Sequence, residues 1–180
     1  NALNGVVVEG NSKSTVMGGP IPLGNVVAAN LQNGIVVQDK ASYFTTYNTF
    51  CGLAAFSDDP SFGNGQDGML ITSTGSNILI RTNVITRNGD DGIEVSGKAK
   101  DVRIVGNIIG LNTDGLIPMG NADNGVEIGG SARNILVGGP QPTFNVIPEN
   151  AISHNGANGV AIVGSARDNI VSHSYIGTEH

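Results

Sequence analysis

The sequence repeats one short template six times. An Asn-Gly or Asp-Gly pair precedes three residues, of which the first and the third are always aliphatic. The six copies begin 29, 34, 24, 33 and 34 residues apart, at Asn4, Asn33, Asp67, Asp91, Asn124 and Asn158. A period in this range indicates an array in which each repeat packs mainly against its two neighbours.

The three residues after each Gly alternate, as the residues of a strand do, so the first and third are expected to face a core. The middle residues are then expected to face outward, and these are Val7, Val36, Leu70, Glu94, Glu127 and Ala161. The first three would form an exposed apolar stripe unless another chain, domain or loop covers them. Five residues after each Gly, a second corner with positive φ is expected at Gly10, Asp39, Ser73, Gly97, Gly130 and Gly164.

Each repeat holds two more short strands. The second strand is predicted at 77–80, 101–104, 134–137 and 168–171, and the third at 25–27, 83–85, 107–109, 145–147 and 174–176. Three strands per repeat describe a coil in which each strand lies on its own copy one turn later, about 4.8 Å away. Asparagine amides can then bond from turn to turn, as expected for a column of Asn25, Asn83, Asn107 and Asn145.

The predicted fold class is therefore all-β, a parallel β-helix of about six rungs with three short strands per rung, in a single domain over residues 1–180. An array of antiparallel hairpins is less compatible, because it would need a second sheet to cover its apolar face. The longer repeats carry insertions at fixed corners, at 18–22, 52–68, 110–125 and 138–142. Such insertions leave the strands in register.

Charge and composition exclude several classes of function. A net charge of -6, with only nine Lys and Arg, argues against nucleic acid as a partner. No apolar run approaches the roughly 18 residues of a membrane span, so no membrane insertion is expected. The single Cys51 cannot form an internal disulfide. Because the chain begins at Asn1, we expect a mature product or an excised fragment.

The corner motifs resemble a known repeat. Residues 109–115 read IGLNTDG, followed by Pro118-Met119-Gly120-Asn121 and then by 124–130, NGVEIGG. This pattern is similar to the right-handed parallel β-helix repeats of the pectin-lyase-like superfamily, in particular to repeats of large secreted or surface-exposed bacterial proteins. The resemblance implies a right-handed coil and an extracellular or cell-surface location. The superfamily includes lyases, glycosidases, epimerases, adhesins and passive spacers, so the resemblance alone does not assign a function.

Two acidic motifs match short motifs of polygalacturonase-like glycosidases. They are Asn112-Thr113-Asp114 and Gly89-Asp90-Asp91. They occur in the opposite order along the chain, and neither Gly-His-Gly nor Arg-Ile-Lys follows them. Asp91 also holds the turn position of the repeat. These departures favour a role in turns over a role in catalysis.

Glu94 and Glu127 are the candidate catalytic carboxylates. They hold equivalent outward positions on adjacent rungs, close to the roughly 5 Å separation of the pair in a retaining glycosidase. Two like charges at that distance would raise one pKa, as an acid and base couple needs. The alternative is that Glu94 and Glu127 are ordinary surface carboxylates that keep the outer face of the sheet soluble. The predicted binding residues are Glu94, Glu127, Asp91 and Arg103.

No metal site or cofactor is predicted. Ca²⁺ remains an alternative, because oxygen-rich turns can bind it and Asp58, Asp59, Asp67, Asp90 and Asp91 lie in or near loops. No repeat has the spacing of a calcium-binding β-roll or an EF-hand, however, and the three histidines share no ligand spacing.

The preferred functional hypothesis is a non-catalytic structural or adhesive β-helix segment that binds carbohydrate along one face. The expected partners are a polysaccharide or glycan, and adjacent β-helix segments or further copies associated end to end. The alternative is a polysaccharide-processing enzyme, either a lyase, a glycoside hydrolase or an epimerase. A viral or phage tail component has the same architecture and stays open as a third class.

Overall fold

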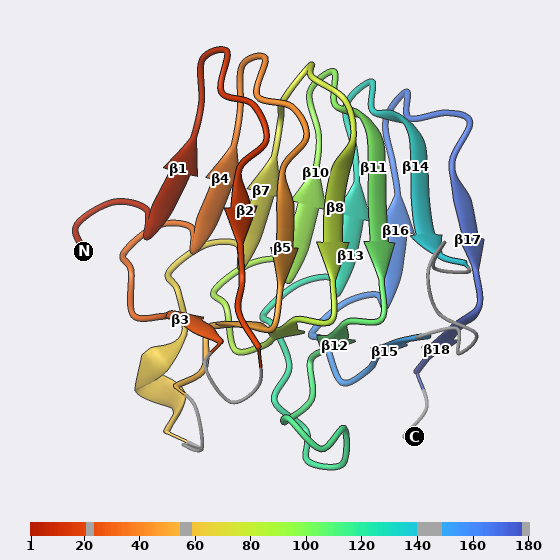
Figure 1. Ribbon diagram of the computed structural model, residues 1–180. Helices are drawn as coiled ribbons and strands as arrows, with labels where there is room; N and C mark the ends of the chain where they lie inside the picture. The colour runs from red at the N-terminus through yellow and green to blue at the C-terminus, as the bar shows by residue number, and fades with distance from the viewer. Residues whose placement is uncertain (21–23, 55–58, 140–148, 178–180) are drawn as a thin grey trace.

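The chain forms three parallel sheets of six strands each (Figure 1). The computed structural model describes residues 1–20, 24–54, 59–139 and 149–177. Helical structure in this part of the chain is limited to the 3₁₀ turn η1 (Pro60–Phe62), and no described helix is long and apolar enough to span a membrane. The all-β prediction is confirmed.

The first sheet holds the first strand of every rung. Its strands are, in spatial order, β1 (Val6–Val8), β4 (Ile35–Val37), β7 (Met69–Ile71), β10 (Ile93–Val95), β13 (Val126–Ile128) and β16 (Val160–Ile162).

The second and third sheets complete each rung. The second sheet holds β2 (Val16–Met17), β5 (Thr45–Tyr47), β8 (Ile78–Arg81), β11 (Lys100–Val105), β14 (Arg133–Gly138) and β17 (Ile170–Ser172). The third holds β3 (Asn25–Val27), β6 (Thr49–Cys51), β9 (Val84–Ile85), β12 (Ile108–Ile109), β15 (Asn150–Ile152) and β18 (Ser174–Ile176). Every strand pairs in parallel with its copies in the adjacent rungs, which confirms a parallel β-helix of six rungs.

The inward side chains form one core along the axis. Ile35, Met69, Ile93 and Val126 are aligned in register in the first sheet, and each is fully buried. Cys51 lies in the same core, where burial raises the pKa of its thiol to about 12. In the four inner rungs the residues predicted to face inward are fully buried, whereas Ile162 in the last rung is 48% exposed. The stacked aliphatic side chains hold the rungs together.

Two expectations need correction, and a third falls outside the described residues. The exposed stripe is not continuous: Val7 is 43% exposed, but Val36 is only 3% exposed because Val7 and Leu70 flank it in register. The strand that pairs with β12 is β15, which begins at Asn150, whereas the expected strand at 145–147 and its Asn145 lie outside the described residues. Ser73 is not among the residues with positive φ, although the other five corner residues are.

Asparagine side chains connect the rungs at three corners. The turn ladder precedes the first sheet and comprises Asn4, Asn33, Asp67, Asp91, Asn124 and Asn158. The loop ladder comprises Asn30, Asn64, Asn88, Asn121 and Asn155. The corner ladder lies where the strands of the third sheet begin and comprises Thr49, Asn83, Asn107 and Asn150. The predicted amide column is thus confirmed at Asn83 and Asn107, and Thr49 replaces an amide in the second rung.

Candidate functional site

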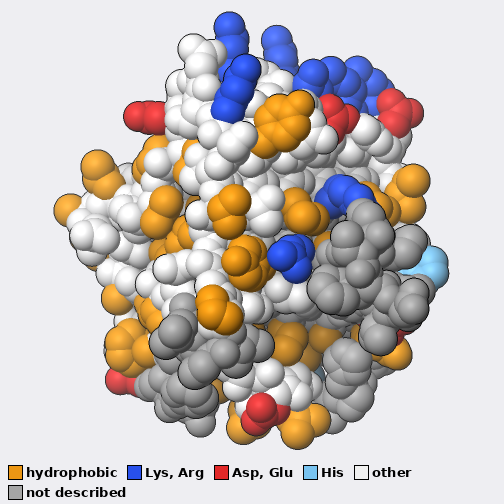
Figure 2. All heavy atoms as spheres, in the orientation of Figure 1, with side chains coloured by type: hydrophobic (Ala, Val, Ile, Leu, Met, Phe, Trp, Pro, Cys, Tyr) orange, Lys and Arg blue, Asp and Glu red, His pale blue; other side chains and the backbone are white. Residues whose placement is uncertain are grey.

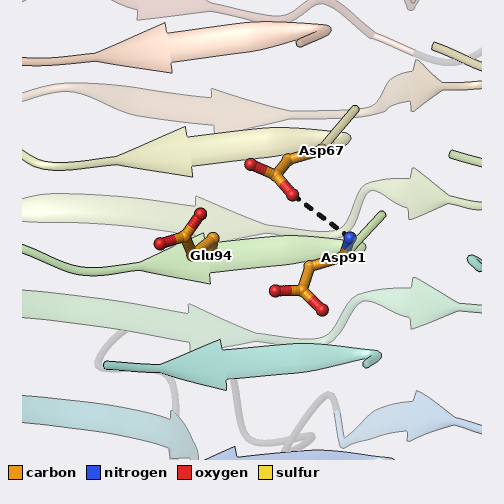
Figure 3. A group of neighbouring side chains, drawn as sticks. All are labelled: Asp67, Asp91 and Glu94. Atoms are coloured by element: carbon orange, nitrogen blue, oxygen red, sulfur yellow. Dashed lines mark hydrogen bonds between the residues drawn. The ribbon is translucent and has the colours of Figure 1, made fainter. Parts of the chain in front are cut away.

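Six carboxylates gather where the turn ladder enters the first sheet. Oxygens of Asp67, Asp91 and Glu94 lie within 4.8 Å of one another, and so do oxygens of Asp90, Asp91 and Asp123. The sixth member, Glu127, adjoins Glu94 in register on β13. We call these six residues the acidic cluster. Figure 3 shows its centre, where Asp67 and Asp91 precede successive strands and Glu94 projects from the middle of β10.

Asp67 and Asp91 are held by the backbone of the following rung. An oxygen of Asp67 accepts a hydrogen bond from the Asp91 N–H at 3.1 Å (Figure 3), and an oxygen of Asp91 accepts one from the Asn124 N–H at 2.8 Å. Both residues are only 4% exposed. Each carboxylate therefore repeats the contact that an asparagine oxygen makes elsewhere in the turn ladder.

Burial and like charges favour the protonated form of these groups. Desolvation, with the negative charge of Glu94 as the next cause, raises the pKa of Asp67 to about 8. Desolvation also raises the pKa of Asp91 to about 6, against the hydrogen bonds that Asn124 donates. The pKa of Asp90 is raised by desolvation and by Asp123. Burial and these neighbouring charges thus favour the neutral, protonated form of Asp67.

Glu94 and Glu127 adjoin each other as the sequence predicts. They are direct partners in the register of β10 and β13, and Leu70 lies on the other side of Glu94. Asn124 donates a hydrogen bond to Glu127 at 3.2 Å. Desolvation and the charge of Glu94 raise the pKa of Glu127. The predicted position of the two residues on adjacent rungs is therefore confirmed, whereas the carboxylate separation and a role for the pair remain predictions.

The other predicted binding residues are divided between two sheets. Asp91 belongs to the acidic cluster, but Arg103 lies on β11 in the second sheet, between Leu79 and Leu136 in register. Figure 2 shows that many Lys and Arg side chains gather at one side of the molecule. Six basic residues lie in or beside the turns that lead from the first sheet to the second: Lys13, Lys40, Lys98, Lys100, Arg133 and Arg167. The acidic cluster lies at the opposite ends of the first-sheet strands.

The remaining acidic candidates lie elsewhere. Asp58 is outside the described residues, and Asp59 accepts a hydrogen bond from the Ser61 N–H at 2.9 Å, which lowers its pKa. Asp114 and Thr113 border a hollow of about 440 Å³ against the third sheet, whose outward side chains there include Phe50. This hollow has no counterpart among the sequence predictions.

The sequence did not lead us to predict that Asp67 lies near Glu94, or that Asp90 lies near Asp123. A usable signal was present, because two of the six turn positions hold Asp where the others hold Asn. Adjacent aspartates in one column must lie one rung apart. The donor set is oxygen only, which suits a hard cation such as Ca²⁺. Hydrogen bonds already engage one oxygen each of Asp67 and Asp91, and a metal-free protein remains our prediction.

Comparisons with known proteins agree with this architecture. The family model described as "Right handed beta helix region" matches residues 1–178, so the chain belongs to the right-handed β-helix family and its coil is right-handed. Among solved structures, it is similar to the A-module of the mannuronan C-5 epimerase AlgE4 from Azotobacter vinelandii, with 18% identity and a TM-score of 0.48. That alignment covers 94% of this chain and 54% of the module, so the chain spans about half its length. No curated protein sequence matches the chain.

Proposed function

We propose that this chain is a non-catalytic structural or adhesive β-helix segment of an extracellular or cell-surface protein, and that it binds glycan along the first sheet. One observation carries the proposal: the Asp67 and Asp91 carboxylates receive backbone N–H groups from the next rung and are almost fully buried. Their primary role is thus to join rungs. A stack of rungs joined in this way suits a protein that holds other surfaces apart.

The outer members of the acidic cluster supply the proposed glycan site. Glu94 and Glu127 are half-buried on the outer face of the first sheet, and Asp90 is exposed beside them. Carboxylate oxygens accept hydrogen bonds from sugar hydroxyls. Because the cluster is acidic and the chain has a net charge of -6, we propose a neutral glycan as the ligand.

Binding to arrays of neutral and acidic glycans, followed by calorimetry, tests this site. We expect the double variant Glu94→Ala/Glu127→Ala to lose at least tenfold in affinity for the bound neutral glycan. Glu9→Ala is the matched control, because Glu9 is an exposed carboxylate in the first rung, far from the cluster along the sheet order. Equal losses in both variants, or binding of acidic glycans only, would contradict the proposed site.

A polysaccharide-processing enzyme is the second candidate, and the Glu94–Glu127 pair specifically favours it. The two residues are in register on adjacent strands, and the charge of Glu94 helps to raise the pKa of Glu127. A carboxylate pair with separated pKa values can supply an acid and a base. With this function, one member of the pair would act as an acid or a base on a glycosidic bond or on a sugar ring proton.

Incubation with a panel of acidic and neutral polysaccharides distinguishes the two candidates. The structural proposal predicts no new reducing ends, no unsaturated ends and no change of sugar configuration. Turnover that Glu94→Gln or Glu127→Gln abolishes, with folding retained by circular dichroism, would replace it with the enzymatic function.

A further inference from the structure

The outer face of the third sheet is apolar along its inner rungs. Phe50 on β6, Val84 on β9 and Ile108 on β12 adjoin one another in register. Each of these side chains is half-buried, and each strand is paired with a neighbour on both sides. The other two sheets carry charged residues on the outer face of the same rungs, such as Glu94 and Arg103. The third sheet thus offers a continuous apolar surface in the middle of the coil.

The loop over residues 110–118 lies next to this apolar face. Leu111 and Pro118 form an antiparallel bridge within it, and the Met119 N–H donates a hydrogen bond to the Gly110 carbonyl at 2.9 Å. Figure 1 shows this loop, which follows β12, extending beyond the third sheet. Because the two ends of the loop are bonded to each other, its tip has a defined position relative to β12.

Asn112 shapes the tip of this loop. Its side-chain oxygen accepts hydrogen bonds from the N–H groups of Leu116 and Ile117 at 2.9 Å and 3.0 Å. Asn112 is only 8% exposed. Asparagine side chains commonly stabilise turns by bonding to the backbone in this way. In the Asn112-Thr113-Asp114 motif, the first residue therefore holds the turn and leaves the other two side chains for contacts outside it.

The loop and the sheet together border a hollow of about 440 Å³, which we call the third-sheet hollow. Its apolar lining includes the three side chains of β6, β9 and β12 described above. Thr113 and Asp114 line it from the loop, and Asn48 and Thr82 line it from the corner that leads into the third sheet. Binding sites for small molecules have volumes of roughly 300–1,000 Å³ and are mainly apolar with a few polar groups. The third-sheet hollow has both properties.

The polar groups that line the hollow favour a ligand that donates hydrogen bonds. The Asn48 amide nitrogen already donates to the Gly19 carbonyl at 2.9 Å, which leaves the Asn48 oxygen as an acceptor. An ionised Asp114 carboxylate can only accept. Asp114 is exposed and forms no salt bridge with a described residue. Among the described residues that line the hollow, none is Lys, Arg or His.

We propose that the third-sheet hollow binds a small organic cation. The apolar body of the ligand packs on Phe50, Val84 and Ile108, and its ammonium group donates a charge-assisted hydrogen bond to the Asp114 carboxylate. The Phe50 ring adds a favourable environment for a nearby cation.

Other classes of ligand fit the hollow less well. An organic anion would be repelled by Asp114 and would find no positive side chain among the described lining residues. A neutral sugar would place several hydroxyl groups against the apolar floor, where they would lose hydrogen bonds to water without replacement. The net charge of -6 also attracts cations to the protein as a whole. The hollow lies on a different sheet from the proposed glycan site, so the two proposals succeed or fail separately.

Calorimetry with probes of matched shape tests the charge of the ligand. The probes are 2-phenylethylammonium, 2-phenylethanol and phenylacetate, with methyl β-glucoside as a neutral sugar. We expect the ammonium to bind about fivefold more tightly than the alcohol, or better, and phenylacetate to bind most weakly of the three. Equal affinities for the three aromatic probes, tighter binding of the sugar, or binding of none of the four would overturn the proposal.

Variants of the hollow test its location. Asp114→Asn should reduce the affinity for the ammonium to that for the alcohol and leave binding of the alcohol unchanged. Asp168→Asn is the matched control, because Asp168 is an exposed carboxylate that precedes β17 of the second sheet. Val84→Thr keeps the shape of the floor but makes it more polar, so it should weaken both probes to the same extent. Circular dichroism checks that each variant is folded.

Two results with these variants would contradict the site. One is an affinity for the ammonium that Asp114→Asn leaves unchanged in the folded protein. The other is an equal loss in Asp114→Asn and Asp168→Asn, which would indicate general attraction by the negative protein. Salt provides a further check, because raising it from about 0.05 M to about 0.5 M should weaken binding of the ammonium and leave the alcohol unaffected. Equal effects of salt on both probes would also contradict the role of Asp114.

Discussion

Asp67 and Asp91 hold turn positions that the other four rungs fill with asparagine. An asparagine amide can accept and donate at once, whereas an ionised carboxylate can only accept. A protonated carboxyl group regains a donor and loses its charge, so it can replace an amide in the ladder. The raised pKa values of both residues agree with this substitution.

This chemistry makes the stability of the protein depend on pH. The pKa of Asp67 is about 8 in the folded protein, against about 3.9 for an unfolded chain. The stabilising contribution of its proton is complete below the unfolded value and is lost as the pH rises through the folded value. The wild-type protein should therefore lose stability between pH 4 and pH 9, by about 2 kcal/mol or more from this group.

Asp67→Asn tests the assignment through urea unfolding at a series of pH values. The variant should be more stable than the wild type at pH 9 and should show a flatter profile, because an amide needs no proton. Asn124→Asp is the reciprocal variant and should steepen the profile. Asp114→Asn, on the exposed corner loop, serves as a control. If Asp67→Asn leaves the pH dependence of the unfolding free energy unchanged, Asp67 does not cause that dependence.

Asn107 illustrates the cost of a missing amide within a ladder. It accepts from the N–H and the side chain of Asn83, and its own amide donates to Asn150. Asn107→Ala would leave buried donors and an acceptor unpaired, at about 1–3 kcal/mol for each group. We expect a loss of at least 2 kcal/mol in the free energy of unfolding, compared with almost none for the exposed Asn11→Ala. A small loss at Asn107 would mean that water replaces the amide.

At the scale of the strand, adjacent residues of β10 have opposite roles. Ile93 is fully buried in the core, whereas Glu94 faces outward and its charge raises the pKa values of Asp67 and Glu127. Ile93→Ala should destabilise the protein by about 2–4 kcal/mol, through lost burial and a cavity. Glu94→Gln should be neutral or stabilising at pH 7, since it removes repulsion. Thermal and urea unfolding of both variants measures these changes. A larger loss of stability in Glu94→Gln than in Ile93→Ala would contradict the prediction.

At the scale of the whole molecule, the shortest repeat can be removed as a unit. The interval from Asp67 to Asp91 is 24 residues and contains β7, β8 and β9. Deleting residues 68–91 joins Asp67 to Gly92 and keeps the repeat template, so β4 should pair with β10. In a linear array, each rung contacts mainly its neighbours, and the shortened chain should fold.

Circular dichroism and urea unfolding test this prediction. The deletion should keep the β spectrum and lower the denaturant slope by about an eighth, in proportion to the chain removed. Deleting residues 80–91 is the matched control, because it removes half a rung and puts inward residues out of register. If both deletions unfold the protein, the rungs are not the modular units that we describe.

The local repeat predicted much of this architecture. The alternation of Ile93, Glu94 and Val95 determined which side chains enter the core, and the turn motif before each strand determined the register that places Glu94 beside Glu127. These features depend on residues close in sequence and on one periodicity. The threonine-rich strands β5 and β6 lack that pattern, so the sequence analysis did not place them.

Other features depended on which side chains the coil brings together. Insertions of unequal length separate equivalent residues by 24 to 43 positions, as they do for Asn83, Asn107 and Asn150. No local pattern distinguishes Asn150 from Asn145 as the next member of that ladder. The sequence alone therefore determined the coil, its three strands per rung and its inward side chains, because a short period requires them. Only the tertiary structure decided the ladders and the acidic cluster, since both arise from contacts between rungs.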